Sequence, residues 1–210
     1  SAQKGSEKRS RVEIRTELGT MVVELYNETP QHRDNFLKLV KEHTYDSLLW
    51  HRVIPQFMVQ GGDPDSKRAK PGQPLGSGGP GYTIPAEINK AFIHKKGVLS
   101  AARQGDQVNP LKASSGSQFY LVQGKSYTAA ELDMLVKRKQ SMAPGKDFSY
   151  TPEQIEAYTK VGGTPHLDGE YTVFGEVVEG LDVIDKIAAV PTAPGDRPVQ
   201  DVHMWMKVVK

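Results

Sequence analysis

The chain has 210 residues, of which 37% are hydrophobic, so it is long enough to form one domain with an adequate buried core. Its 27 basic and 25 acidic residues leave a net charge of +2, which excludes a general electrostatic attraction to nucleic acid or anionic lipid. The absence of cysteine excludes disulfides, thiol nucleophiles and thiolate metal sites.

The first ten residues, SAQKGSEKRS, are polar and offer nothing apolar to bury. We therefore expect residues 1–10 to form a disordered tail. The start has no apolar signal core, and no apolar run reaches the roughly 20 residues that span a bilayer. If a leader has been removed, the periplasm or cell envelope is favoured, and otherwise the cytoplasm; the compartment stays open.

The stretch RVEIRTELGTMVVELY alternates apolar and polar residues on both sides of Gly19-Thr20. This pattern predicts a β-hairpin that starts near Arg11. A helix is expected next, with Thr29 as its N-cap and Pro30 at its first position, because an apolar stripe with helical spacing follows.

The remainder of the chain is rich in predicted strands. They are expected at residues 48–54, 57–61, 97–102, 117–122, 171–178 and 202–209, with a short helix at 181–189. Many strands and few helices favour a closed or sandwich-like β architecture.

One stretch, PDSKRAKPGQPLGSGGPGY, is dominated by glycine and proline and has almost nothing to bury. It predicts a surface loop. Phosphate binding is not expected, because the GxxxxGK[ST] spacing is missing and no helix start follows the glycines.

Residues 124–163 predict a helical hairpin inserted into this strand-rich chain. Thr128 with Glu131, and Thr151 with Gln154, form two capping boxes that each precede an apolar stripe. Because the caps and stripes are self-contained, we expect the insertion to be dispensable for chemistry. Its own role is not indicated by the sequence.

Conventional catalytic motifs are missing from the sequence. The six histidines form no HExxH or HxxxH pair, and neither a GxSxG elbow nor a GxGxxG that opens a helix is present. An enzyme built on this chain would therefore work without a metal, a cofactor or a covalent intermediate.

The stretch HRVIPQFMVQGGDP, at residues 51–64, places an arginine and a glutamine in an apolar strand pair. It resembles the signature strand pair of the cyclophilins, the peptidyl-prolyl cis-trans isomerases, of bacterial type. Further segments resemble successive family blocks in the same order: GVLSAA at 97–102, GSQFYL at 116–121, HLDGEYTVFGEV at 166–177 and EGLDVIDKI at 179–187. The resemblance covers nearly everything from Val12 onward except the insertion.

The resemblance implies a mainly β fold, a closed eight-stranded antiparallel barrel capped by two helices. With the inserted helical hairpin, residues 11–210 would form a single domain. The substrate groove would lie on the outer face of the barrel rather than in its lumen, and the protein is expected to be a monomer.

Matched position by position, the resemblance puts the catalytic arginine on Arg52, with Gln60 positioning it. The implied substrate-binding positions are Phe57, Met58, Ala102, Arg103, Gln118, Tyr120, His166, Leu167 and Tyr171. Strict alternation along a strand puts Phe57 and Gln60 on opposite faces, so their presence in one groove requires a local twist or bulge.

Four of these positions depart from the residue that many family members have. They are His166 in place of Trp, Tyr120 in place of Phe, Tyr171 in place of His, and Arg103 in place of Asn. The departures lie at the rim, so peptide preference and drug sensitivity are less secure than the reaction type. Weak cyclosporin binding is expected.

The implied function is rotation about Xaa-Pro bonds in proline-containing peptides and in unfolded or folding proteins, without a cofactor. Two alternatives stay open. One is a proline-peptide binding module or chaperone with little turnover, and the other is a small-ligand β-barrel with an open apolar lumen. Nucleic acid is not an expected partner.

Overall fold

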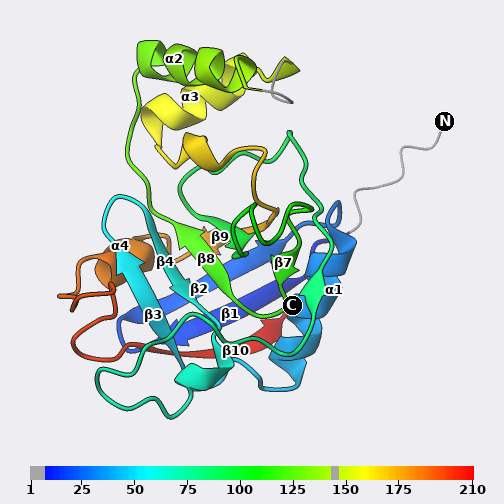
Figure 1. Cartoon of the computed structure of the whole chain (residues 1–210). Helices are drawn as coiled ribbons and strands as arrows, with labels where there is room; N and C mark the ends of the chain where they lie inside the picture. Colours follow the sequence, from blue (N-terminus) through cyan, green and yellow to red (C-terminus); the bar gives the residue numbers. More distant parts are fainter. Residues whose placement is uncertain (1–7, 143–146) are drawn as a thin grey trace.

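The computed structural model of the chain describes residues 8–142 and 147–210. Eight strands close into an antiparallel barrel in the order β1-β10-β3-β4-β8-β6-β9-β2, as predicted (Figure 1). The strands are β1 (Arg11–Thr16), β2 (Gly19–Leu25), β3 (Leu48–Ile54), β4 (Met58–Gly61), β6 (Val98–Ala101), β8 (Phe119–Val122), β9 (Val173–Glu179) and β10 (His203–Val209).

Alternation along the first hairpin decides which side chains enter the lumen. Val12 and Ile14 of β1, and Val23 of β2, are fully buried, whereas their polar neighbours face outward. The same core cluster includes Trp50 and Phe119 from the far side of the barrel. In the part of the chain that the structure describes, these side chains fill the lumen, which excludes the small-ligand barrel.

Two helices cover the ends of the barrel. Helix α1 (Pro30–Lys41) buries Phe36, and helix α4 (Asp182–Ala188) buries Ile184 and Ile187, against the lumen cluster. Figure 1 shows the two helices on opposite sides of the sheet. The predicted pair of capping helices is confirmed.

The predicted start of α1 is confirmed, with Thr29 at the N-cap position and Pro30 as the first helical residue, but the hydrogen bonds at this end come from another segment. Thr29 occupies the N-cap position, but its hydroxyl lies 3.4 Å from the carbonyl oxygen of Tyr26 and makes no cap bond. Instead, the backbone N–H groups of Gln31 and His32 donate to the Glu87 carboxylate at 3.2 and 2.8 Å. A carboxylate suits the positive end of the helix dipole better than a hydroxyl does.

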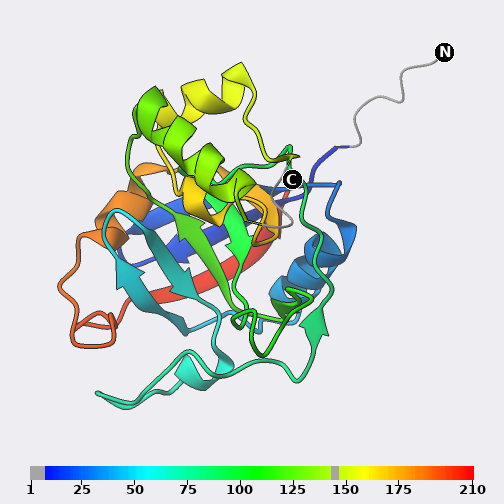
Figure 2. The same cartoon turned by 45° about the horizontal axis from the view of Figure 1, so that its top comes forward.

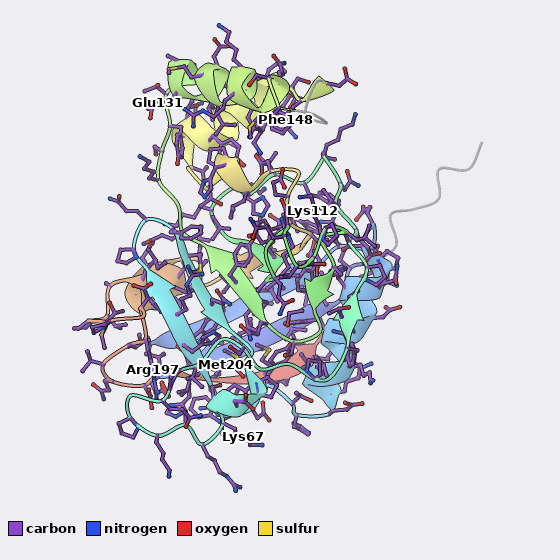
Figure 3. The ribbon with its side chains drawn as sticks, in the orientation of Figure 1. Lys67, Lys112, Glu131, Phe148, Arg197 and Met204 are labelled. Carbon is purple, nitrogen blue, oxygen red and sulfur yellow. The ribbon has the colours of Figure 1, made fainter. Side chains whose placement is uncertain are left out.

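The insertion stands outside the barrel as helices α2 (Ala129–Gln140) and α3 (Pro152–Lys160) (Figures 1 and 2). Both predicted capping boxes are present. In Figure 3, Glu131 and Phe148 lie in this upper part of the molecule, whereas Met204 lies in the barrel below.

The expectation that the insertion is self-contained is wrong. Its apolar cluster is built on Leu132 and the fully buried Tyr158, but it also includes Ile93, which precedes β6. The remaining members are Tyr127, Tyr150, Ile155 and Ala157. The insertion therefore shares its core with a barrel loop.

The predicted Gly/Pro-rich loop is a surface segment that begins with the 3₁₀ turn η1 (Pro64–Ser66). A small sheet of β5 (Thr83–Ile84) and β7 (Ser114–Ser115), and the turn η3 (Pro165–Leu167), complete the fold. These elements of two or three residues are too short for a periodic pattern to announce them.

The predicted tail falls mainly on residues 1–7, which lie outside the described residues. The last residues of the predicted tail are described. The carbonyl oxygen of Ser10 accepts a hydrogen bond from the N–H of Leu25 at 2.9 Å. The Arg9 guanidinium lies 4.7 Å from the centroid of the Tyr26 ring. The expected disorder therefore does not extend to Arg9 and Ser10.

Candidate active site

The corner between β3 and β4 places the central side chains of the candidate site. Arg52 lies in β3, opposite Gln60 in β4, and the register of this pair shifts between Trp50 and Arg52. Phe57 precedes β4, in a turn closed by its N–H to Ile54 at 3.1 Å. Because Phe57 lies in this turn, strand alternation does not fix the direction of its side chain, and it can share a groove with Gln60. The turn thus has the effect expected of a twist or bulge, whereas the register shift itself lies in β3.

A pocket of about 120 Å³ opens beside Arg52 on the outer face of the barrel. Met58 and Tyr120 contribute buried surface to it, and the Tyr120 ring meets the Tyr171 ring edge to face, with centroids 5.9 Å apart. All of its lining residues belong to the predicted set: Arg52, Phe57, Met58, Gln60, Ala102, Arg103, Tyr120, Leu167 and Tyr171. The fold brings together residues from four segments of the chain.

A relay of hydrogen bonds holds the exposed Arg52 side chain at the mouth of this pocket. Its Nη1 donates to Gln60 Oε1 at 3.2 Å, and Gln60 Nε2 donates to Gln118 Oε1 at 3.0 Å. Gln118 Nε2 then donates to the carbonyl oxygens of Gly76 and Gly78, at 2.9 and 2.7 Å.

The two ends of the relay decide the orientation of both amides. The Arg52 guanidinium can only donate, and backbone carbonyls can only accept, so each glutamine must turn its oxygen toward Arg52 and its nitrogen toward the glycines. The reverse orientation of either amide would oppose two donors or two acceptors. The position of Arg52 is thus tied to the Gly/Pro-rich loop.

Gln118 and His166 are the predicted binding residues that stand outside the pocket lining. Gln118 lines an adjoining cavity of about 900 Å³, which Gln60, Ala102 and Arg103 border as well. The His166 ring lies 5.6 Å from the Phe57 ring, at the rim, with its other side exposed. Partial burial, together with the nearby positive groups, lowers the pKa of His166 below its usual value.

The Arg103 side chain is engaged within the protein. Its Nε donates to the Glu170 carbonyl at 2.8 Å, and its Nη1 lies 3.0 Å from Asp106 Oδ1. The guanidinium also stacks over the Tyr171 ring at 4.4 Å. The side chain therefore joins the loop after β6 to the pocket wall.

Two groups of residues at the site have no sequence signal that could have found them. The Gly76 and Gly78 carbonyls act through backbone atoms, which residue types do not reveal. The buried side chains of His94, Ser100 and Asp168 lie behind Tyr120, and Asp168 is 74 residues from His94 in the sequence. Both groups depend on tertiary placement.

A pocket of about 120 Å³ beside a held guanidinium, next to a cavity of about 900 Å³, has room for one ring and for neighbouring residues of a peptide. The fold is a closed eight-stranded antiparallel barrel that carries this pocket beside Arg52. The profile of the family "Cyclophilin type peptidyl-prolyl cis-trans isomerase/CLD" matches residues 11–208. The chain belongs to this cyclophilin family of isomerases, which confirms the predicted fold and reaction class.

Bacterial relatives agree with this assignment. A protein from Staphylococcus saprophyticus that bears the name of a peptidyl-prolyl cis-trans isomerase is 33% identical over 193 residues, covering 90% of this chain and 86% of its own. A protein from Streptococcus pyogenes serotype M6, named as a bifunctional phosphatase and peptidyl-prolyl cis-trans isomerase, is 35% identical over 198 residues. The match covers 91% of this chain but only 37% of the length of that protein.

Solved structures show the same fold. A cyclophilin type peptidyl-prolyl cis-trans isomerase from Cryptosporidium parvum superposes with a TM-score of 0.68 and 22% identity, covering 96% of this chain and 98% of that one. The structure of that isomerase in the presence of the dipeptide Ala-Pro gives a TM-score of 0.67. Across the described residues, no helix has the length and apolar character needed to cross a membrane.

Proposed function

We propose that the pocket beside Arg52 receives the proline ring of an Xaa-Pro bond and that Arg52 catalyses rotation about that bond. The relay carries this proposal, because it holds an exposed hydrogen-bond donor at the mouth of a pocket of about 120 Å³. Proline-containing peptides are the ligands of the family, and unfolded or folding proteins that expose such bonds are the proposed substrates.

The proposed role of Arg52 follows from the electronic structure of the amide. Resonance sets a barrier of roughly 18–20 kcal/mol to rotation, so the uncatalysed exchange takes tens of seconds or more. As the bond twists, the proline nitrogen becomes pyramidal and gains a lone pair. A guanidinium N–H aimed at that nitrogen stabilises the twisted state more than either planar state, which lowers the barrier.

The apolar walls have a separate role in this proposal. Phe57, Met58, Tyr120 and Leu167 hold the ring and exclude water from one side of the bond. The long cavity next to Gln118 would take neighbouring residues of the peptide, with the Arg103 backbone pairing to the chain. Gln60 positions Arg52 and faces the peptide backbone.

The test is exchange spectroscopy on a short Xaa-Pro peptide with the wild-type protein and Arg52→Ala. A hydrogen bond from a charged group contributes about 1.5–3 kcal/mol, and each 1.36 kcal/mol is a factor of ten in rate, so Arg52→Ala should lower kcat/KM by about tenfold to a few hundredfold. Circular dichroism checks the fold. A folded Arg52→Ala protein with an unchanged rate would overturn the mechanism.

Two further variants sharpen this test. Arg52→Lys should restore little, because an ammonium lacks the planar fork that reaches the proline nitrogen while one arm stays on Gln60. Phe57→Ala should weaken peptide binding as well as turnover, whereas Arg52→Ala should leave much of the binding intact. Wild-type protein that binds the peptide but leaves its exchange rate unchanged would be a recognition module or chaperone instead.

Cyclosporin is a proposed but weak ligand of the same groove. His166 stands at the rim against Phe57, where it presents less apolar area than the indole that many relatives have. The imidazole is also better hydrated, so the free energy gained on covering it is smaller.

A further inference from the structure

A buried carboxylate lies between the helical insertion and the proline pocket. Asp168 is 4% exposed and directly follows Leu167, which lines the pocket, and His166, which lies at its rim. Its Oδ2 accepts hydrogen bonds from Tyr150 at 2.6 Å and from Tyr158 at 2.5 Å. Both phenols belong to the insertion, so a segment outside the barrel supplies two donors to the wall of the site.

The other oxygen of Asp168 connects to the floor of the pocket. Asp168 Oδ1 accepts the backbone N–H of His94 at 2.7 Å and lies 2.8 Å from His94 Nδ1. The opposite ring nitrogen, Nε2, lies 3.0 Å from the Tyr120 hydroxyl, which is 2.9 Å from Ser100 Oγ. Tyr120 is a lining residue of the pocket. The chain from insertion to pocket is thus continuous.

Donors and acceptors alternate consistently along this chain. A carboxylate accepts only, so His94 donates through Nδ1–H, and its Nε2 meets the Tyr120 hydroxyl, which can donate as well as accept. Burial raises the pKa of Tyr150 and of Tyr158, and the negative charge of Asp168 raises both further. The two phenols therefore stay protonated and serve as donors.

The insertion also holds the main chain of the wall. Lys139 Nζ donates to the Asp168 carbonyl at 2.6 Å and to the His166 carbonyl at 3.3 Å, and the Tyr150 hydroxyl lies 3.3 Å from the Pro165 carbonyl. Turn η3 is only three residues long, so its own hydrogen bonds provide little rigidity. Most polar contacts that hold this wall come from α2, α3 and their connection.

We propose that Tyr150 and Tyr158 are positioning residues for the proline pocket, acting through Asp168 on Leu167 and on the His94–Tyr120 pair. The insertion is then part of the support of the binding site, contrary to the expectation that it is dispensable for chemistry. This inference rests on the proposed function of the pocket. Since the affected residues touch the bound ring and not the rotating nitrogen, peptide affinity depends on the insertion while Arg52 continues to act.

The test is the double variant Tyr150→Phe/Tyr158→Phe in the full chain, which removes both donors to Asp168 Oδ2 but keeps both rings. We expect KM for an Xaa-Pro peptide, and the Kd from a titration, to rise about tenfold. The value of kcat should stay within about twofold. The methyl NMR signals of Leu167 should also shift in the free protein. A packing change confined to the insertion would leave these signals unchanged.

Tyr127→Phe is the matched control. Tyr127 packs in the same apolar cluster, but among the described residues the donors to the Asp168 side chain are His94, Tyr150 and Tyr158. This variant should keep wild-type affinity and wild-type Leu167 signals. If the double variant does not fold, Tyr150→Phe alone, at a half-buried position, should raise Kd about threefold with the same NMR signature.

The outcomes separate this inference from the proposed function. A folded double variant with the Kd and the Leu167 signals of the Tyr127→Phe control overturns the positioning role. For Tyr150→Phe, an unchanged Kd and unchanged signals do the same. Wild-type protein that binds peptide without accelerating exchange would instead refute the proposed catalysis, and the Kd and NMR measurements would still decide the role of the two tyrosines.

Discussion

Replacing Gln118 by glutamate tests whether the relay holds Arg52 in place. Gln118 is 5% exposed and donates both of its amide hydrogens, to the carbonyl oxygens of Gly76 and Gly78. A carboxylate keeps the shape and can still accept from Gln60. When ionised, it has no hydrogen to donate, so it would face two carbonyl oxygens at the present distances of 2.9 and 2.7 Å.

The cost of that arrangement decides the size of the effect. Each buried acceptor left without a donor costs about 1–3 kcal/mol, and the repulsion adds to it. The side chain will therefore rotate away, and Gln60 loses its partner and releases Arg52. Because Arg52 keeps its charge and most of its reach, we expect kcat/KM to fall about tenfold at pH 8, less than for Arg52→Ala.

The loss should depend on pH in a defined direction. Burial and the two carbonyls raise the pKa of the introduced carboxyl in the folded protein above the ordinary value of about 4.3. The penalty is therefore absent below about pH 4.3 and grows as pH rises through the folded-state pKa. When protonated, the group can donate to the Gly78 carbonyl again and accept from Gln60, so much of the activity should return at acid pH.

The assay is peptide exchange from pH 5 to 8, expressed as the ratio of variant to wild-type kcat/KM so that other titrations cancel. Gln118→Met is the control, since it has similar volume but neither donates nor accepts well; its ratio should be low and independent of pH. Denaturant unfolding at each pH follows stability in parallel. A Gln118→Glu ratio that does not change with pH, or a fully active Gln118→Met, would refute the relay as the support of Arg52.

Two further predictions concern His166. His166→Trp should tighten cyclosporin binding by roughly 1 kcal/mol, measured by calorimetry, because indole adds apolar area at the rim; unchanged affinity would mean that His166 does not contact the ligand. In the wild type, the His166 ring packs against Phe57, and its pKa is lowered first by burial and then by His94 and Lys139, against the opposing effect of Asp168. Peptide affinity should therefore be constant above about pH 6.5 and fall as pH drops through the lowered pKa, and His166→Gln should abolish this acid limb in binding titrations.

The first two strands could be predicted from alternation because each has one buried face. Val12, Ile14 and Val23 follow that pattern closely, and β1 and β2 were placed within a residue or two. Closure of the barrel could not be predicted from the residues, because pairings such as β1 with β10 join the two ends of the chain. Only the family resemblance supplied that topology.

The capping of helices illustrates the same boundary between local and non-local information. Thr128 and Thr151 cap α2 and α3 through partners three residues away, so the sequence alone predicts them. The N-terminus of α1 is capped by Glu87, which is distant in sequence, and no local motif marks it. Thr29 is the N-cap residue, as predicted, but the groups that accept the hydrogen bonds at this end could not be predicted for this reason.

The candidate site follows the same rule. The resemblance predicts which residues line the pocket, but it does not predict which groups their side chains contact. The Arg103 side chain is bound to the Glu170 carbonyl and the Asp106 carboxylate. Side-chain partners of this kind depend on which loops meet, and residue types at matched positions do not carry that information.

The two hydrogen-bond networks that support the site share no residue. The relay through Gln118 reaches Arg52 from the Gly/Pro-rich loop, whereas Asp168 reaches Leu167 and Tyr120 from the insertion. Perturbations at separate sites without common partners usually add in free energy. If the relay sets the donor and the insertion sets the ring pocket, combining Gln118→Met with Tyr158→Phe should multiply their effects on kcat/KM, the first acting mainly on kcat and the second on KM. Such independence would let the insertion vary in sequence, and with it the preferred peptide, without loss of the chemistry at Arg52.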